Sequence, residues 1–261
     1  MNTPSFSFPQ LAEDERLDKV NEQIYLIQKK KGLTFGTDAF LLAAFVRQSA
    51  HTVAVELGGG TGIVSLLLAA KKKVKQITVA EIQPAFAELI DRNARINGYE
   101  DRVKALCDDV RELNAAKIGR EVDLVVSNPP YMKCNAGKRN VEDEKYIARH
   151  EVCGQIHDFC AAAGRLLRHG GKFVCVWRPD RTSELFAGLR EAKLEPKRIT
   201  FVHADADAEP CMMLVESIKG GAPSVRTSAP LLLYEAKVPD QPQRILTPSA
   251  QKIYDDCCFT L

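Results

Sequence analysis

The sequence predicts an α/β fold of the Rossmann-like type, a mostly parallel seven-stranded sheet with helices on both faces. Between residues 51 and 218, short apolar runs alternate with segments whose apolar residues recur every three or four positions. Two of the runs are almost continuously apolar, as expected of strands that are buried on both faces of a parallel sheet. Right-handed crossovers would bring the loops after the strands to one edge, where ligands bind.

Composition and charge limit the possible functions. The 261 residues suffice for one large α/β domain, and the net charge of +2 is too small to identify a nucleic-acid-binding protein. No apolar stretch is long enough to cross a bilayer, and the acidic first twenty residues do not resemble a signal peptide. The eight scattered cysteines suit reduced thiols, several of them in the core, so a cytoplasmic location is expected.

The chain is expected to fall into an N-terminal cap segment (1–50), a core (51–218) and a C-terminal extension packed on the core (219–261). Residues 1–23 look loosely structured, 24–28 and 33–35 are predicted as a short hairpin, and Thr37 or Asp38 as the cap of a helix over 39–46. The expected core strands are 53–57, 76–80, 103–107, 122–127, 172–177, 199–202 and 212–217. The expected core helices are 62–70, 84–97, one through about 152–166, and 183–192. A strand near 231–234 and a helix opened by Thr247-Pro248 are predicted in the extension.

A glycine-rich turn, Glu56-Leu57-Gly58-Gly59-Gly60-Thr61-Gly62, is the first candidate site. Gly58, Gly60 and Gly62 allow the backbone to turn sharply and to approach a ligand closely. Their spacing is G-x-G-x-G, whereas dinucleotide sites have G-x-G-x-x-G. Glu56 would repel a pyrophosphate, but it suits a cofactor whose tail carries an ammonium group. The turn, Thr61 included, is therefore predicted to bind a nucleoside cofactor other than NAD.

Two acids follow the next two predicted strands. Glu81, which precedes Ile82, lies 19 residues beyond Gly62 and has the reach to accept hydrogen bonds from ribose hydroxyls. Asp109, which precedes Val110, is placed to accept a hydrogen bond from an adenine amine. Either acid alone is equally well explained as a solvated loop residue. Together, at the ends of consecutive strands, they predict an adenosine site.

The motif Asn128-Pro129-Pro130-Tyr131 follows the strand predicted at 122–127. The prolines fix the backbone and lack N–H donors, so the carbonyl groups of the turn can accept hydrogen bonds. Asn128 adds a side-chain acceptor, and Tyr131 adds a ring on which a base can stack, worth roughly 1–3 kcal/mol. Paired acceptors would hold an exocyclic amine and free its lone pair for attack. The alternative is a proline-rich turn in which Tyr131 is simply packed.

In order and spacing, the glycine turn, the two acids and the Asn-Pro-Pro-Tyr motif resemble the class I methyltransferases that modify amino groups. Phe35-Gly36-Thr37-Asp38-Ala39, Leu41-Leu42, Ala148-Arg149-His150-Glu151, Leu246-Thr247-Pro248 and Ile253-Tyr254 resemble the bacterial enzymes that methylate N6 of adenine 37 in valine tRNA. Gly59 departs mildly from that pattern, since relatives often carry a larger residue there. The resemblance to the class I methyltransferases covers about residues 24–218.

The resemblance implies S-adenosylmethionine (SAM) as cofactor and RNA as partner. Thr37 and Asp38 would border the cofactor, Glu56 would hold its ammonium group, Glu81 its ribose and Asp109 its adenine. Gly58, Gly60 and Gly62 would form the floor of the cofactor site. Asn128 and the Pro129 carbonyl would align the target amine, while Tyr131 stacks on the base.

Alternatives remain at this stage. The same motif occurs in methyltransferases acting on protein glutamine N5 and on guanine N2 of rRNA, and a catalytically silent SAM- or RNA-binding protein is a third possibility. His150, Cys153 and His157 have the helical spacing of metal ligands, but they lack a second ligand pair, so no metal is expected. Residues 29–31 and the basic loop 131–149 are candidates for phosphate contacts, and the run 71–73 is expected to be solvated.

Overall fold

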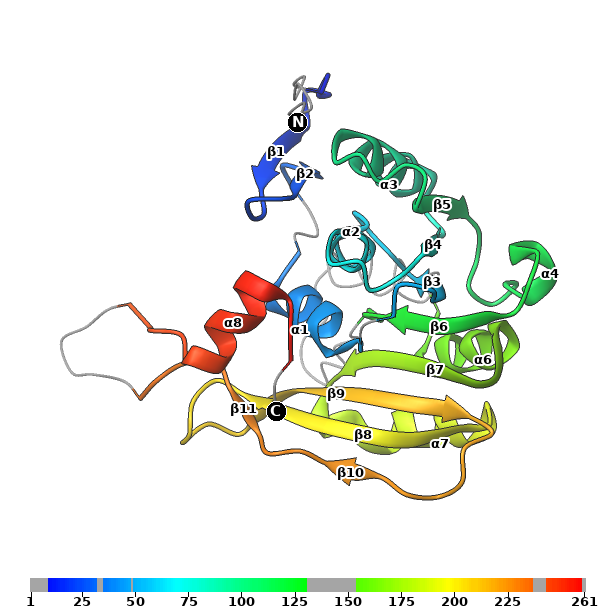
Figure 1. The fold of residues 1–261 in the computed structure, drawn as a ribbon, viewed down its shortest axis with the longest axis vertical. Coiled ribbons are helices and arrows are strands. Elements are labelled where there is room, and N and C mark those ends of the chain that lie inside the picture. Colours follow the sequence, from blue (N-terminus) through cyan, green and yellow to red (C-terminus); the bar gives the residue numbers. More distant parts are fainter. Residues whose placement is uncertain (1–8, 32–34, 48, 131–153, 237–242, 260–261) are drawn as a thin grey trace, which may run out of the picture.

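The computed structural model describes residues 9–31, 35–47, 49–130, 154–236 and 243–259. Within these residues, nine strands form one sheet in the order β10-β8-β9-β7-β6-β3-β4-β5, and β11 also pairs with β8 (Figure 1). Only β9 is antiparallel to its neighbours in the described sheet, which confirms the mostly parallel fold. The strands are Val53–Leu57 (β3), Gln76–Glu81 (β4), Val103–Cys107 (β5), Val122–Ser127 (β6), Leu167–Trp177 (β7), Leu194–His203 (β8), Pro210–Lys219 (β9), Arg226–Thr227 (β10) and Leu231–Leu232 (β11).

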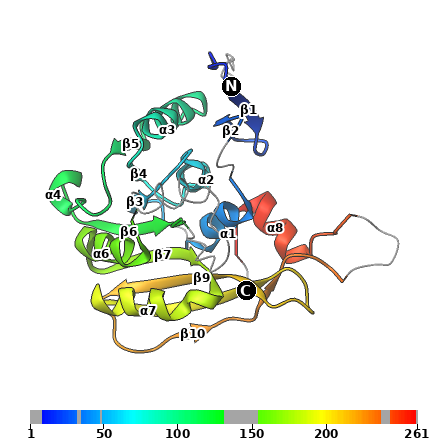
Figure 2. The same cartoon turned by 180° about the vertical axis from the view of Figure 1, so that it is seen from behind.

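Helices cover both faces of the sheet (Figures 1 and 2). Alternate residues of one strand face opposite sides, so Leu124 and Val126 of β6 join one buried cluster while Val125 joins the other. The first cluster packs under α1, α2, α3 and α8, and the second under α6 and α7. These helices are Thr37–Phe45 (α1), Ile63–Ala70 (α2), Pro84–Ile96 (α3), Ile156–Leu166 (α6), Thr182–Glu191 (α7) and Pro248–Asp256 (α8).

The short helix Ala115–Ile118 (α4) and the 3₁₀ turn Pro179–Arg181 (η1) were not predicted. One turn of helix carries too little periodicity for detection from sequence. Strands β7, β8 and β9 also begin earlier or end later than expected, because polar residues at their ends still pair in the sheet. In the part of the chain that the structure describes, no helix is long and apolar enough to cross a membrane.

The N-terminal hairpin differs from the prediction. Tyr25–Lys29 (β2) pairs antiparallel with Glu15–Lys19 (β1), which lies in the segment expected to be loosely structured. Of the partner predicted at 33–35, residues 33 and 34 lie outside the described residues. The polar side chains of β1 make it resemble a loop in the sequence, whereas Leu26 and Ile27 of β2 are fully buried. Lys29, a candidate for phosphate contacts, forms ion pairs within this hairpin: its Nζ lies 3.0 Å from Asp14 and 3.4 Å from Glu15.

Helix α1 begins at Thr37, so neither Thr37 nor Asp38 is its N-cap, and that expectation was wrong. Gly36 occupies the cap position without a side-chain hydrogen bond. At the other end of α1, Lys73 is only 1% exposed, although the run 71–73 was expected to be solvated. Its ammonium donates to the carbonyl groups of Ala43, Ala44 and Val46 at 2.7, 3.0 and 2.8 Å. A buried lysine thus binds carbonyl groups that the helix end leaves without intrahelical partners.

The segment after β9 lies against the rest of the molecule. Strands β10 and β11 both pair with β8, and α8 packs on α1. As predicted, Thr247 caps α8: its hydroxyl accepts a hydrogen bond of 3.1 Å from the Ala250 N–H. The Tyr254 ring of α8 lies 5.0 Å from the Phe40 ring of α1, and Phe259 makes an edge contact with Phe45.

Candidate active site

The strand order reverses at the boundary between β3 and β6, and the candidate site lies there. From β3 the chain proceeds outward to β4 and β5, whereas β6 and β7 lie on the other side of β3. Such a switch point leaves a crevice at the carboxyl ends of the strands. Leu57 and Ser127 are partners in the register, and the Ser127 hydroxyl donates to the Leu57 carbonyl at 2.8 Å. The glycine turn and the Asn-Pro-Pro turn therefore leave the sheet side by side.

Backbone hydrogen bonds hold the glycine turn against β4. The N–H groups of Gly58 and Gly59 donate to the Ala80 carbonyl at 2.9 and 3.3 Å. The Gly60 N–H donates to Oε2 of Glu81 at 3.0 Å. Gly60 has a φ of 54°, and a Cβ built on it would meet none of the described residues within 4 Å. There is thus open space beside the Glu81 carboxylate, where the backbone presents no side chain.

Gly59 is required for a different reason. A Cβ at this position would lie 2.0 Å from Cγ1 of Val79, a fully buried residue of β4. The turn packs so closely on the sheet that no larger side chain fits without moving Val79. The absence of a side chain at Gly59, which departs from the family pattern, is therefore matched to the packing of this chain.

Glu56 is buried below the glycine turn, with 2% of its surface exposed. Its Oε2 accepts hydrogen bonds from both the backbone N–H of Ser65, at 3.0 Å, and the Ser65 hydroxyl. Burial raises the pKa of Glu56 to about 7, against these two hydrogen bonds, which lower it; the nearby Glu81 raises it further. The carboxylate therefore fixes the first turns of α2 and sits where a cation would stabilise its charge.

Glu81 ends β4 and is 6% exposed. Besides the bond from Gly60, its Oε1 accepts the Gln83 N–H at 3.0 Å. Burial raises the pKa of this carboxyl, and the backbone donors oppose that shift. Its neighbour Ile82 is half-buried, with a carbonyl 3.9 Å from the Cys107 thiol. The structure thus brings Glu81 directly to the glycine turn, as the sequence predicts.

Asp109 follows β5 and is bound to Arg111. The Arg111 guanidinium donates to both carboxylate oxygens, at 3.0 and 2.9 Å through Nε. This side-chain bond lowers the pKa of Asp109, so the carboxylate is ionised. Val110 beside it is buried, and its carbonyl accepts a bond of 3.0 Å from Arg165. The Arg111 pairing was not predicted, and an adenine amine would share the carboxylate with it.

Asn128 is bound to Asp38. Its Nδ2 donates to Oδ2 of Asp38 at 2.8 Å, across 90 residues of sequence. A carboxylate only accepts hydrogen bonds, so the amide must turn its NH₂ group to Asp38 and its Oδ1 away. Pro129 is buried and Pro130 half-buried. Tyr131 lies outside the described residues, as does the basic loop that follows it.

The neighbouring Thr37 is held by the distant helix α8. The Tyr254 hydroxyl donates to Oγ1 of Thr37 at 2.8 Å, and burial raises the pKa of Tyr254. The Phe40 ring lies 5.0 Å from the Tyr254 ring and 6.0 Å from the Phe35 ring, tilted against both. The sequence motifs placed Thr37 at the site and included Ile253-Tyr254 in the resemblance, but they gave no reason to connect the two segments.

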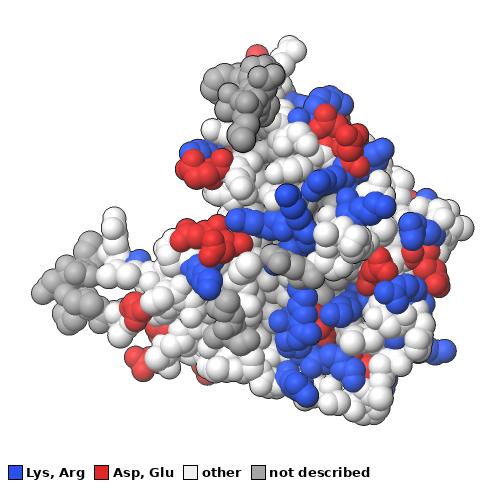
Figure 3. All heavy atoms as spheres, in the orientation of Figure 1, with Lys and Arg blue, Asp and Glu red and all other residues white. Residues whose placement is uncertain are grey.

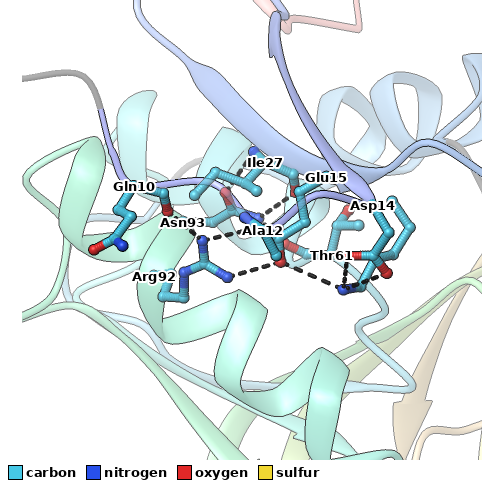
Figure 4. A network of polar contacts seen from close by, with 9 residues as sticks. Gln10, Ala12, Asp14, Glu15, Ile27, Thr61, Arg92 and Asn93 are labelled. Atoms are coloured by element: carbon cyan, nitrogen blue, oxygen red, sulfur yellow. Dashed lines mark hydrogen bonds and ion pairs between the residues drawn. The ribbon is translucent and has the colours of Figure 1, made fainter.

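The N-terminal hairpin also reaches the glycine turn (Figure 4). Asn93 of α3 accepts the Ile27 N–H at 2.7 Å and donates to the carbonyl groups of Ile27 and Thr61, at 3.1 and 3.0 Å. Next to it, Arg92 forms two bonds of 2.8 Å with Glu15, which lower the pKa of Glu15 to about 2. Asn93 therefore ties β2, α3 and Thr61 into one unit, and no sequence pattern indicated it.

Of the three residues with the spacing of metal ligands, the structure describes only His157. His150 and Cys153 lie outside the described residues, and His157 Nδ1 lies 3.0 Å from the Glu191 carboxylate. The described residues contain no group of three or more His, Cys, Asp or Glu side chains that could hold a metal ion.

Solved structures share the fold. A predicted O-methyltransferase from Agrobacterium tumefaciens aligns with a TM-score of 0.67 and 22% identity, covering 85% of this chain and 98% of its own. The tRNA m1G37 methyltransferase of M. jannaschii aligns with a TM-score of 0.53 and 18% identity, covering 80% of this chain and 58% of its own. At these identities the likeness concerns the fold alone.

Sequence relatives agree with that fold. A tRNA1(Val) (adenine(37)-N6)-methyltransferase from Porphyromonas gingivalis is 27% identical over 201 residues, covering 75% of this chain and 78% of its own length. A relative of the same name from a Flavobacteriaceae bacterium is 28% identical over 190 residues, covering 72% and 78%. The family described as methyltransferase small domain matches residues 29–192, more than half of the chain. The chain therefore belongs to the methyltransferase small domain family.

Proposed function

We propose that this methyltransferase is a cytoplasmic enzyme that transfers a methyl group from SAM to the exocyclic N6 amine of adenine 37 in a valine tRNA. The observation that carries the proposal is the pairing of two turns at the switch point, joined by the Ser127–Leu57 hydrogen bond. One turn has the open space and the carboxylates suited to a nucleoside, and the other has the acceptors suited to an amine. Curated relatives that carry the name of this activity support the choice of substrate.

The residues present fit SAM. A Cβ on Gly60 would fill the open space beside Glu81, whose carboxylate is suited to ribose hydroxyls. Buried Glu56 has a raised pKa, and an ammonium group nearby would hold it ionised. Asp109 would accept from the adenine amine, with Ile82 and Val110 beside the base and Gly58, Thr61 and Gly62 completing the turn. Thr37 and Asp38 would border the methionine part. When bound, SAM supplies an electrophilic methyl group on its sulfonium.

The catalytic contribution of the chain is alignment. Asp38 receives the Asn128 NH₂ group and so directs Oδ1 of Asn128 away from itself. That oxygen, together with the Pro129 carbonyl, would accept the two N–H bonds of the target amine, and Tyr131 would stack on the base. These acceptors also stabilise the positive charge that develops on nitrogen during the transfer. The methylated nitrogen then loses a proton to water, so no strong general base is required.

The target base must leave its stack to reach these acceptors. An adenine in an anticodon loop is single-stranded, so it can be turned out at modest cost. Glutamine amides and guanine amines present similar donors, so protein glutamine N5 and rRNA guanine N2 are the competing substrates. A catalytically silent binding protein is the non-enzymatic alternative, although belonging to a methyltransferase family and keeping the Asn-Pro-Pro-Tyr motif weigh against it.

One labelling experiment separates these substrates. The purified chain is incubated with SAM that carries a radiolabelled methyl group. Three separate reactions contain bulk tRNA, rRNA or protein from cells that lack this gene. We expect label in tRNA alone, and digestion to nucleosides should yield N6-methyladenosine. Label in protein or in N2-methylguanosine would transfer the assignment to those substrates. No transfer to any fraction, with SAM still bound, would leave the silent binding protein.

A further inference from the structure

A cavity of about 280 Å³ lies on the sheet near the C-terminal end of α1, away from the candidate active site. Residues from five separate segments line it, and five of its lining side chains are basic against one carboxylate: Arg47, Lys172, Lys197, Arg198, Arg226 and Glu216. The whole chain carries a net charge of only +2, so this concentration of positive charge is local. Figure 3 shows Lys and Arg side chains crowded over β8 and β9, in the lower centre of the view.

Arg198 is held rigidly in the wall of this cavity. Its guanidinium lies 3.6 Å from the centre of the Phe45 ring and donates to the Phe45 carbonyl at 2.6 Å. It also lies 3.2 Å from Oε2 of Glu216. Its Nε is buried and has no hydrogen-bond partner among the described residues. That donor is closed off from the cavity, so an anion would be attracted by the charge of the fixed guanidinium as a whole, which lines the cavity and needs no rearrangement.

The remaining charges are unbalanced. Glu216 serves both Arg198 and Lys172, the latter at 3.7 Å. No carboxylate forms an ion pair with Arg47, Lys197 or Arg226 within the described residues. Burial lowers the pKa of Arg198, and the nearby Arg47 lowers it further, so the cations oppose one another. An anion in the cavity would relieve that repulsion.

We propose that this cavity binds a backbone phosphate of the RNA substrate, at some distance from the methylated base. The inference rests on the proposed function. Helix α1 joins the two sites, because Asp38 lies in its first turn and Phe45 at its end. Seven residues at 1.5 Å each separate Asp38 from Phe45 by about 10 Å along the helix, so a base and a backbone phosphate of one RNA strand can occupy the two sites together. Phosphate contacts of this kind fix the register of an RNA without reading its sequence.

The test removes together the three cations that form no ion pair among the described residues, as Arg47→Gln, Lys197→Gln and Arg226→Gln; of these, Lys197 donates to the Ala222 carbonyl. Arg198, Lys172 and Glu216 stay, since they support the fold. The matched control removes three exposed cations outside the cavity, as Lys75→Gln, Arg120→Gln and Arg190→Gln. Binding to bulk tRNA is measured from low to high salt, together with KM for tRNA, kcat and SAM affinity.

We expect the cavity variant to show a salt dependence of log K shallower by about 0.7 for each phosphate that the protein no longer neutralises, and a KM for tRNA raised about tenfold. Its kcat at saturating tRNA and its SAM affinity should match those of the unmodified protein.

Equal changes in the cavity variant and the control would overturn the site. The thermal stability of both proteins is also measured with and without inorganic phosphate. If the cavity variant binds tRNA normally but is no longer stabilised by phosphate, the cavity holds a free anion and the site for RNA is overturned. If the unmodified protein methylates no RNA, the proposed function fails first; if it does so and the cavity variant behaves identically, only this inference fails.

Discussion

The side-chain amide of Asn128 donates a hydrogen bond of 2.8 Å to Asp38, a residue of the first turn of α1. The contact joins a turn that follows the fourth core strand to a segment that precedes the first. The two residues would have different roles in the reaction: Asn128 would contact the substrate, whereas Asp38 would orient Asn128. Substitutions can separate these two roles.

Asn128→Ala should lower kcat by at least about 10²-fold, because it deletes an acceptor placed where charge develops. The affinity for SAM, measured by calorimetry, should stay within about twofold of the unmodified protein. Equal losses of kcat and affinity would show that Asn128 is structural.

Asp38→Asn should lower kcat about tenfold while changing SAM affinity little. An amide at position 38 can donate as well as accept, so it no longer dictates which way the Asn128 amide faces. Single-turnover rates and SAM affinity measured in parallel test this. A variant that binds SAM poorly but transfers at the normal rate once saturated would show that Asp38 serves the cofactor alone and does not orient Asn128.

SAM affinity should increase between pH 6 and pH 8, because Glu56, with a pKa of about 7, must ionise to receive the ammonium group. Glu56→Gln should bind SAM about tenfold more weakly at pH 8 and lose this pH dependence. Ser65→Ala is the control: it removes one hydrogen bond that favours the ionised carboxylate, so it should shift the dependence to higher pH. An unaltered pH profile in Glu56→Gln would assign the effect to another group.

The same pKa affects stability. The folded protein binds the Glu56 proton up to about pH 7, whereas an unfolded chain releases it near 4.5. Stability attributable to this group therefore falls as pH rises from 4.5 to 7, by up to about 3 kcal/mol, and the cost is fully present above pH 7. Denaturant unfolding should show Glu56→Gln gaining stability relative to the unmodified protein across this window.

Gly59→Ala should destabilise the fold by about 1–3 kcal/mol and weaken SAM binding, because its Cβ would lie 2.0 Å from Val79. Adding Val79→Ala supplies room, so the double variant should bind SAM better than Gly59→Ala alone. A coupling energy near zero in this cycle would show that the two sites do not clash.

Tyr254→Phe keeps the ring against Phe40 but deletes the hydroxyl that donates to Thr37. One hydrogen bond within the folded protein is worth about 1 kcal/mol, so the free energy of unfolding, measured with denaturant, should fall by about that amount. Thr37→Val removes the other partner and should give a similar loss that does not add to the first. Additive losses would mean that the two side chains act separately.

Local pattern was enough to predict the core strands and the sheet edge at which the glycine turn and the Asn-Pro-Pro turn lie. The periodicity of 53–57 and 122–127 and the glycine spacing are carried by neighbouring residues, so each segment reveals its own structure. Contacts between segments that are distant in the sequence were not predicted. The β1–β2 pairing depends on polar residues that resemble a loop, and the burial of Lys73 depends on the position of α1. Asn93–Thr61 and Tyr254–Thr37 span 32 and 217 residues and leave no periodic trace.

The bond between Thr37 and Tyr254 also sets an order of assembly. During synthesis, the seven core strands have all been made by residue 219, yet the partner of Thr37 is not made for another 35 residues. A ribosome-bound chain can thus form its sheet early, while Thr37, which is proposed to border the cofactor, lacks its contact with Tyr254 until α8 docks. Contacts this distant in sequence form late and slowly. Full methyl transfer should therefore begin only after the segment beyond the sheet has folded back onto α1, which guards against modification by unfinished chains.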